Sequence, residues 1–190
     1  MYNLLRSEIL MSTKTDDKSF LVSFETAVLQ PIQMNNKIFT KVTNISGETT
    51  IIGRKPYDIV RQSCSYYGSS FQQSVKLSKE ALGNYHKLPT IIAHDYGNPC
   101  ILIPTLSPKS DLNVWFSYRT IQSFHSSEEG CVVVLTNGHS VLINSSAATI
   151  SRQIAFANML NIHFHKRMSR LTNEAILISR NQLFQKDFQD

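Results

Sequence analysis

The densest group of side chains that could do chemistry lies within the ten residues Arg61–Ser70, RQSCSYYGSS. The backbone N–H groups of Gly68, Ser69 and Ser70 would stand at the start of a helix, where amides can bind a phosphate oxygen. Tyr67 could stack on a base or donate a hydrogen bond. Five cations near this segment could neutralise the phosphates of a nucleic acid: Arg54, Lys55, Arg61, Lys76 and Lys79.

The same segment has a simpler interpretation as a corner between two helices. Gly68 is typical of the position after a helix, and Ser70 is typical of the cap that begins the next one. A corner of this kind needs no ligand. Both interpretations stay open on the sequence alone.

A second basic group follows residue 150. Arg152, Met159, His163, Lys166 and Arg170 recur at helical spacing and form one stripe of an expected helix. Arg167 lies beside this stripe. These cations could follow a phosphate backbone or an acidic partner, and an ordinary solvated helix face would have the same pattern.

The distribution of charge supports a polyanion as partner. The chain carries 19 Lys and Arg against 14 Asp and Glu, a net charge of +5 with neutral histidines. Residues 51–94 and 151–180 each have a net charge of +4, whereas residues 95–150 have a net charge of −2. Two basic segments around an acidic one favour an acidic binding partner, with duplex DNA as one candidate.

Enzyme chemistry has no support in the motifs. Cys64 could be a nucleophile only with a histidine base, and none of the six histidines lies in a recognisable catalytic pattern. His163 and His165 are two apart, so on a helix they face different directions and share a metal poorly. We therefore expect no catalytic residue, no metal and no cofactor.

Composition indicates one domain in the cytoplasm. The chain has 190 residues, of which 42% are hydrophobic and 17% are charged, enough apolar side chains for a sizeable core. No apolar run reaches the ~20 residues of a membrane span, so we expect no membrane contact. Three cysteines without CxxC spacing favour reduced thiols.

Alternation and turn residues predict the elements that position these groups. We expect strands at 20–29, 37–43, 49–52, 90–93, 101–103, 114–125, 131–136 and 139–143, with a type I′ turn at Asn137-Gly138. Helices are expected from Pro56 to about Gly68, from Ser70 to Leu82, and from about Ala147 behind a cap at Asn144, Ser145 or Ser146. The predicted fold class is α+β, with antiparallel β-hairpins, two short central helices and a long C-terminal helix packed on the sheet.

Two blocks of this sequence resemble the ComK family of competence transcription factors. The first is Lys55-Pro56 followed by Arg61–Ser70, which contains the pattern SCxxYGSS, and the second is Ile103-Pro-Thr-Leu-Ser107 followed by Trp115. The hairpin Thr136-Asn-Gly-His139 and the last helix follow these two blocks in the order that the family has. The resemblance covers roughly residues 12–165.

The resemblance implies a transcription activator of the genes for DNA uptake and transformation. Proteins of this family bind paired A/T-rich boxes of double-stranded DNA, largely through the minor groove, as dimers that form larger oligomers. They help RNA polymerase to start, and an adaptor delivers them to a Clp protease. One departure concerns Phe71–Val75, where family members often carry a basic triplet and this chain has its first cation at Lys76.

We therefore predict three parts: a flexible N-terminal tail over residues 1–11, with Met11 as a possible start, a ComK-like DNA-binding domain over residues 12–166, and a C-terminal regulatory tail or arm over residues 167–190. Two alternatives stay open. The chain could be a protein-interaction module whose basic face binds an acidic partner, or a β-rich DNA-binding protein that inserts loops into the major groove, as LytTR-type regulators do.

Overall fold

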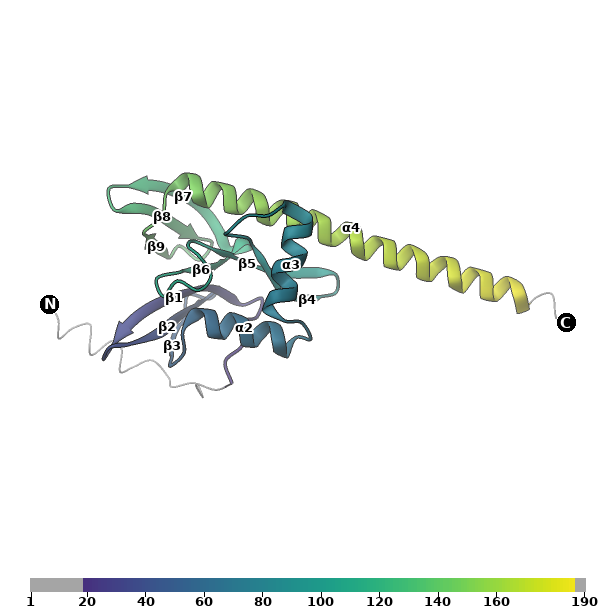
Figure 1. Cartoon of the computed structure of the whole chain (residues 1–190), viewed down its shortest axis with the longest axis horizontal. Helices are drawn as coiled ribbons and strands as arrows, with labels where there is room; N and C mark the ends of the chain where they lie inside the picture. The colour runs from purple at the N-terminus through teal and green to yellow at the C-terminus, as the bar shows by residue number, and fades with distance from the viewer. Residues whose placement is uncertain (1–18, 187–190) are drawn as a thin grey trace.

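A six-stranded antiparallel sheet forms the centre of the molecule. The computed structural model describes residues 19–186, with side chains placed through residue 173. Figure 1 shows the sheet, whose strand order is β3-β2-β1-β6-β5-β4. Its strands are β1 (Thr26–Met34), β2 (Lys37–Asn44), β3 (Thr49–Ile52), β4 (Thr90–Asp95), β5 (Asn98–Pro104) and β6 (Trp115–Ser117).

Helices α2 (Pro56–Tyr66) and α3 (Phe71–Leu82) pack against one face of this sheet. The side chains of β5 show that both faces of the six-stranded sheet are buried. Leu102 points into the core beneath α2, together with Trp115 of β6, whereas Ile101 and Ile103 point to the opposite face. Because successive side chains of a strand alternate between faces, a strand buried on both sides is apolar throughout.

A second, three-stranded antiparallel sheet and helix α4 cover the opposite face. This sheet has the order β7-β8-β9, with β7 at Ile121–Ser127, β8 at Gly130–Leu135 and β9 at Ser140–Ile143. Val133 and Leu135 of β8 pack with Phe116 of the large sheet and with Ile150 and Leu160 of α4. The molecule therefore has a helical layer, a central sheet, and a mixed layer of sheet and helix.

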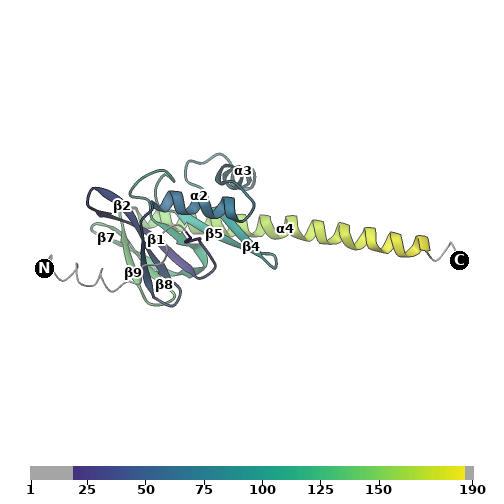
Figure 2. The ribbon, with the colours of Figure 1, turned by 90° about the horizontal axis from the view of Figure 1, so that it is seen from below.

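Helix α4 (Ala147–Lys186) is the longest element, with 40 residues. It begins at Ser146, whose hydroxyl accepts a hydrogen bond from the Thr149 N–H at 3.2 Å. Its first half packs on the body through Ile150, Ala157 and Leu160. Its second half extends well beyond the body, as Figures 1 and 2 both show.

The predicted fold class is confirmed: antiparallel sheets, two short central helices and a long C-terminal helix form an α+β fold. The predicted cap of the last helix is Ser146, and Ser70 and Gly83 begin and end α3 as expected. The predicted N-terminal tail, residues 1–11, lies outside the described residues. Helix α4 runs without a break across residue 166, where we had placed a domain boundary.

The bounds predicted for the first strand were wrong. The alternation at 20–24 predicted a strand from residue 20, but β1 begins at Thr26 and continues to Met34. In the earlier segment Val22 is buried without being in a strand, because its N–H donates to the Ser63 hydroxyl of α2 at 2.9 Å rather than to a neighbouring strand, and residues 23–25 are exposed. Pro31 is tolerated inside β1 because that part of the strand has a partner on one side only.

The long strand predicted over 114–125 was also wrong. The structure divides it into β6, a short 3-10 helix at Tyr118–Thr120, and β7. The Thr120 hydroxyl lies 2.9 Å from the Ser117 carbonyl and 3.3 Å from the Ala27 carbonyl, which holds the bend against β1. At this bend the chain leaves the six-stranded sheet and enters the three-stranded one.

The turn type predicted at Asn137-Gly138 was wrong as well. A type I′ turn needs positive φ at both central residues, and here only Gly138 has it, at 83°. Among the described residues, two turns meet this requirement: Asn35-Asn36 between β1 and β2, with φ values of 49° and 58°, and Tyr96-Gly97 between β4 and β5, with φ values of 45° and 79°. Asparagine tolerates this conformation better than other residues with a side chain.

Candidate nucleic-acid interface

The corner between α2 and α3 uses its amides internally. The N–H of Gly68 donates to the Ser65 carbonyl at 3.2 Å, and the N–H of Ser69 donates to the Cys64 carbonyl at 3.0 Å. The N–H of Ser70 donates to the Gln73 side chain, while the Ser70 hydroxyl accepts from the Gln73 N–H. The corner interpretation therefore accounts for all three amides, and phosphate binding by them stays a prediction.

Tyr67 is exposed next to this corner. Its ring packs edge-on against Tyr66 with 5.2 Å between ring centroids, and both rings are well exposed, at 42% and 70%. Partial burial raises the pKa of Tyr67 above its usual value, so the hydroxyl remains a hydrogen-bond donor at neutral pH. This pair of rings could meet a base or a partner surface.

Three of the predicted cations are engaged by groups of the protein itself. Arg54 donates to the Phe20 carbonyl at 2.7 Å and to the Gln62 side chain, so it ties the N-terminal segment to α2. Two ion pairs join the others to carboxylates: Lys55–Asp111 at 2.9 Å and Arg61–Asp58 at 3.7 Å. Exposed ion pairs are weak, about 0–1 kcal/mol, so Lys55 and Arg61 can exchange partners at low cost.

Lys76 and Lys79 differ from these three. Both are exposed on α3, one turn apart, and within the described part of the chain neither side chain makes an ion pair or hydrogen bond. Glu80 is the carboxylate that shares their helix face. Of the first basic group, these two lysines are the most accessible to a polyanion.

The second basic group lies along α4. Arg152 is exposed near the start of the helix, in the half of α4 that packs on the body. Lys166, Arg167 and Arg170 are exposed further along. His163, which we placed on the same stripe, is partly buried instead, because it faces α3. The basic stripe therefore has two separate parts.

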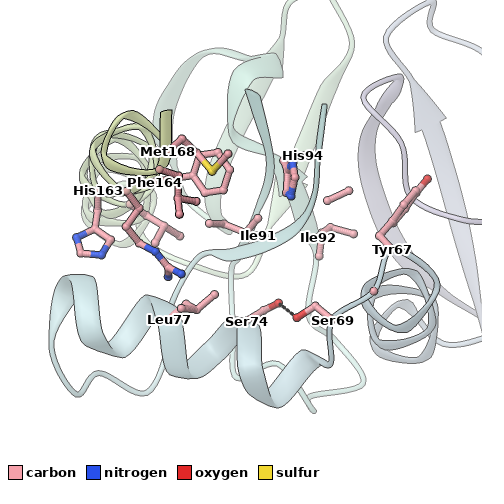
Figure 3. A pocket seen from close by; sticks show the side chains of 15 residues that line it. Tyr67, Ser69, Ser74, Leu77, Ile91, Ile92, His94, His163, Phe164 and Met168 are labelled. Carbon is pink, nitrogen blue, oxygen red and sulfur yellow. Dashed lines mark hydrogen bonds between the residues drawn. The ribbon is translucent and has the colours of Figure 1, made fainter. Parts of the chain in front are cut away.

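The helix corner and one cation of the second basic group, Arg167, meet at a pocket of about 260 Å³ between α3, β4 and α4, which Figure 3 shows. Tyr67, Gly68 and Ser69 line it from the helix corner, and Arg167 lines it from α4. Most of its wall is apolar, with Leu77 of α3, Ile91 and Ile92 of β4, and Leu160, Phe164, Met168 and Leu171 of α4. His94 and His163 were not predicted as site residues, and both line this pocket.

Arg54, Arg61 and Ser70 meet in a second place, a shallow depression between α2 and the start of α3. Asp58 shares this depression and reduces its positive charge. Lys76, Lys79, Arg152, Lys166 and Arg170 line neither place. The predicted residues therefore fall into three groups: those that line the pocket, those that line the depression, and exposed cations that line neither.

Groups for other chemistry are sparse in residues 19–173. No cluster of three or more metal-ligating side chains occurs there. Burial raises the pKa of Cys64 and of Cys100 to about 11, so both are neutral thiols at physiological pH. None of the helices within the described residues is long and apolar enough to cross a membrane.

Two cations that sequence reasoning missed lie in β2. Lys37 and Lys41 are exposed and belong to the hairpin of β1 and β2. The signal was present in the sequence, because no acidic residue occurs between Glu25 and Glu48. Counting charge over residues 1–50 as one segment hid it.

The fold and its surface define a class: a small α+β protein with basic side chains on exposed helix and strand faces. A family model described as "ComK protein" matches residues 17–169. The chain therefore belongs to the ComK family, as its motifs indicated. It is 27% identical over 161 residues to a protein named "Competence transcription factor" from Bacillus subtilis strain 168, a match that covers 83% of this chain and 82% of the relative. No solved structure matches.

Proposed function

We propose that this protein is a DNA-binding transcription activator of competence genes, which control DNA uptake and transformation. Membership of the ComK family and the similarity to a competence transcription factor support this proposal. The structural observation that carries it is the pair Lys76 and Lys79, two exposed residues on one helix face whose side chains form no ion pair or hydrogen bond with any described residue. Such side chains can replace condensed counterions along a phosphate backbone.

A/T-rich DNA is the target that we propose, bound largely through the minor groove. A/T tracts have a narrow minor groove with enhanced negative potential, which attracts Arg and Lys. A net charge of +5 on one protomer is modest, so we propose that two or more protomers share one pair of boxes. The deformability of the DNA would then supply much of the discrimination.

The remaining partners follow from the family. We propose that the bound protein helps RNA polymerase to start and that a Clp protease adaptor controls its level. The part of α4 that extends beyond the body is free of the central core in Figure 1, so it can meet such partners without unfolding the domain. An activator of this kind acts in the cytoplasm, where the chromosome lies.

The test is duplex binding over a series of salt concentrations. We expect tight binding to a duplex with two A/T tracts one helical turn apart, competed by a minor-groove drug, and weak binding to a G/C-rich duplex. The double variant Lys76→Ala/Lys79→Ala should weaken binding to both and reduce the slope of log K against log salt by about two units, since each phosphate contact contributes about 0.9.

The matched control removes two cations from the acidic segment, in Lys109→Ala/Arg119→Ala. This variant loses the same charge, and we expect it to change the slope by less than about half a unit. An unchanged slope in Lys76→Ala/Lys79→Ala would contradict the assignment of those lysines. No binding of the unmodified protein to either duplex would favour the protein-interaction module instead.

A further inference from the structure

The hairpin of β1 and β2 extends beyond the rest of the central sheet. The two strands pair with each other from Thr26–Asn44 to Met34–Lys37. Strand β6 pairs with β1 only at Val28 and Leu29, and β3 pairs with β2 only at 40–43. Residues 30–39 therefore form a two-stranded ribbon that no other described strand borders.

The turn Asn35-Asn36 ends this ribbon at the edge of the molecule. Figure 1 places that end on the opposite side of the body from the extending half of α4. At the other end of the hairpin the three-stranded sheet contacts it, where the Asn137 side chain donates to the Asn44 carbonyl at 3.0 Å. Five residues at about 3.3 Å each give the ribbon a reach of roughly 17 Å.

The ribbon is basic and has no carboxylate. Lys37 lies in the ribbon and Lys41 lies at its base, where β2 also pairs with Ile51 of β3. Both lysines are exposed, and the nearest acidic residues in the sequence are Glu25 and Glu48, beyond both ends of the strand pair. The side chain of neither lysine makes an ion pair or hydrogen bond with any residue from 19 to 173. The positive charges of Lys37 and Lys41 are therefore available to a polyanion.

The strand register places both lysines on one face. Lys37 lies opposite Met34, Phe39 lies opposite Ile32, and Lys41 lies opposite Gln30. The three pairs alternate with the pair formed by Gln33 and Ile38, so they share one side of the ribbon. That face has lysines at both ends and three partly buried apolar side chains between them.

We infer that the β1–β2 ribbon is a second DNA-binding element, which enters a major groove of A/T-rich duplex DNA. The inference rests on the proposed function and goes beyond it, since the proposed contacts are mainly in the minor groove. A two-stranded ribbon fits a major groove of about 12 Å and is too wide for an undistorted minor groove of about 6 Å.

The side chains of this face match what the major groove of A/T pairs presents. Lys37 and Lys41 bind phosphates on the two sides of the groove. Ile32 and Met34 contact thymine methyl groups, and the Gln30 amide can bond to adenine N6 and N7. Thymine methyls and adenine N7 are found only in the major groove, which makes this inference separable from minor-groove binding.

Two experiments test it on the full chain. In the first, Lys37→Gln/Lys41→Gln is titrated with the duplex of two A/T tracts over the same salt series. We expect the slope of log K against log salt to fall by about two units. In the second, every thymine of that duplex is replaced by deoxyuridine, which removes the methyl groups and leaves the minor-groove edges intact.

Matched variants on neighbouring positions separate the two faces of the ribbon. The unmodified protein should bind the deoxyuridine duplex about 3- to 30-fold more weakly than the thymine duplex, by analogy with the loss of one apolar contact. Met34→Ala should reduce this difference, and Ile32→Ala/Met34→Ala should abolish it. Gln33→Ala, on the opposite face of the same strand, and Lys76→Ala/Lys79→Ala should both keep it.

The failures of the two proposals are distinguishable. If the unmodified protein binds neither duplex, the proposed function fails and the inference falls with it. If it binds A/T-rich DNA but shows no thymine–deoxyuridine difference and Lys37→Gln/Lys41→Gln keeps the full salt slope, the inference alone is overturned. It is also overturned if this variant changes the oligomeric state in sedimentation without changing the slope, because the face would then bind protein.

Discussion

Cys64 of α2 and Cys100 of β5 lie in one core cluster beneath the helical layer. Desolvation is the main cause that raises the pKa of each thiol, to about 11 in both cases. The Cys64 thiol also bonds to Ser74, which opposes the shift only in part. Because the thiolate is the reactive form, these positions are protected from oxidation and alkylation while the protein is folded.

At the residue scale we predict that neither thiol reacts with iodoacetamide at pH 8 in the folded protein, whereas both react within minutes in urea. Stability should fall from about pH 9 to pH 11, because unfolded thiols ionise near 9.0 and folded ones near 11. Mass spectrometry after timed alkylation measures the first effect, and urea unfolding at pH 8 and pH 10 measures the second. Rapid labelling of either cysteine at pH 8 would refute the buried placement.

Helix α3 depends on its cap, at the element scale. Ser70 and Gln73 satisfy each other's backbone N–H groups, and the helix then ends at Gly83, which has a φ of 99°. The cap orients the face that carries Lys76 and Lys79. The same Ser70 is one of the predicted phosphate contacts, so its two roles need to be separated.

We predict that Ser70→Ala lowers the free energy of unfolding by about 1 kcal/mol, whereas Ser70→Asn stays within about 0.5 kcal/mol, because asparagine caps helices as well as serine. Urea denaturation gives both values. If Ser70 only caps α3, the two variants should bind DNA equally well at temperatures where both are folded. A loss of affinity in Ser70→Asn at full stability would show that the hydroxyl contacts DNA.

The whole molecule consists of a body and an extending helix half, and they should differ in what they contribute to stability. Among the residues of α4 whose side chains are described, through residue 173, the fully buried ones are Ile150, Gln153, Ala157 and Leu160, all in its first half. Leu171, the last apolar residue of α4 with a described side chain, is 60% exposed. Within residues 19–173, the contribution of α4 to the core therefore comes from its first half.

At this scale we predict that deleting residues 174–190 changes the free energy of unfolding by less than about 0.5 kcal/mol, as surface changes usually do. Leu160→Ala should cost about 2–5 kcal/mol, because it opens a cavity in the core. Thermal or urea denaturation compares them. If the deletion destabilises the body as much as Leu160→Ala does, residues 174–190 must pack on it or on a second copy.

Local signals in the sequence were enough to predict the ends of those helices that are capped by residues at the ends themselves. Ser70, Gly83 and Ser146 begin or end helices through hydrogen bonds and backbone angles that span only a few residues. The two predicted blocks of the ComK family and the α+β class were likewise readable, because alternation and helical spacing are properties of short segments. The predicted DNA contacts stay predictions at every residue.

Tertiary structure alone decided what depends on distant partners. The break at Tyr118–Thr120 exists because Thr120 reaches the Ala27 carbonyl, 93 residues away, and the chain then changes sheets. Arg167 meets Tyr67 at one pocket, and Lys37 and Lys41 lie on and at the base of the two-stranded ribbon, for the same reason. Pairing between strands and packing between layers involve residues far apart in the chain, so no local pattern specifies which edges stay open or which cations share a surface.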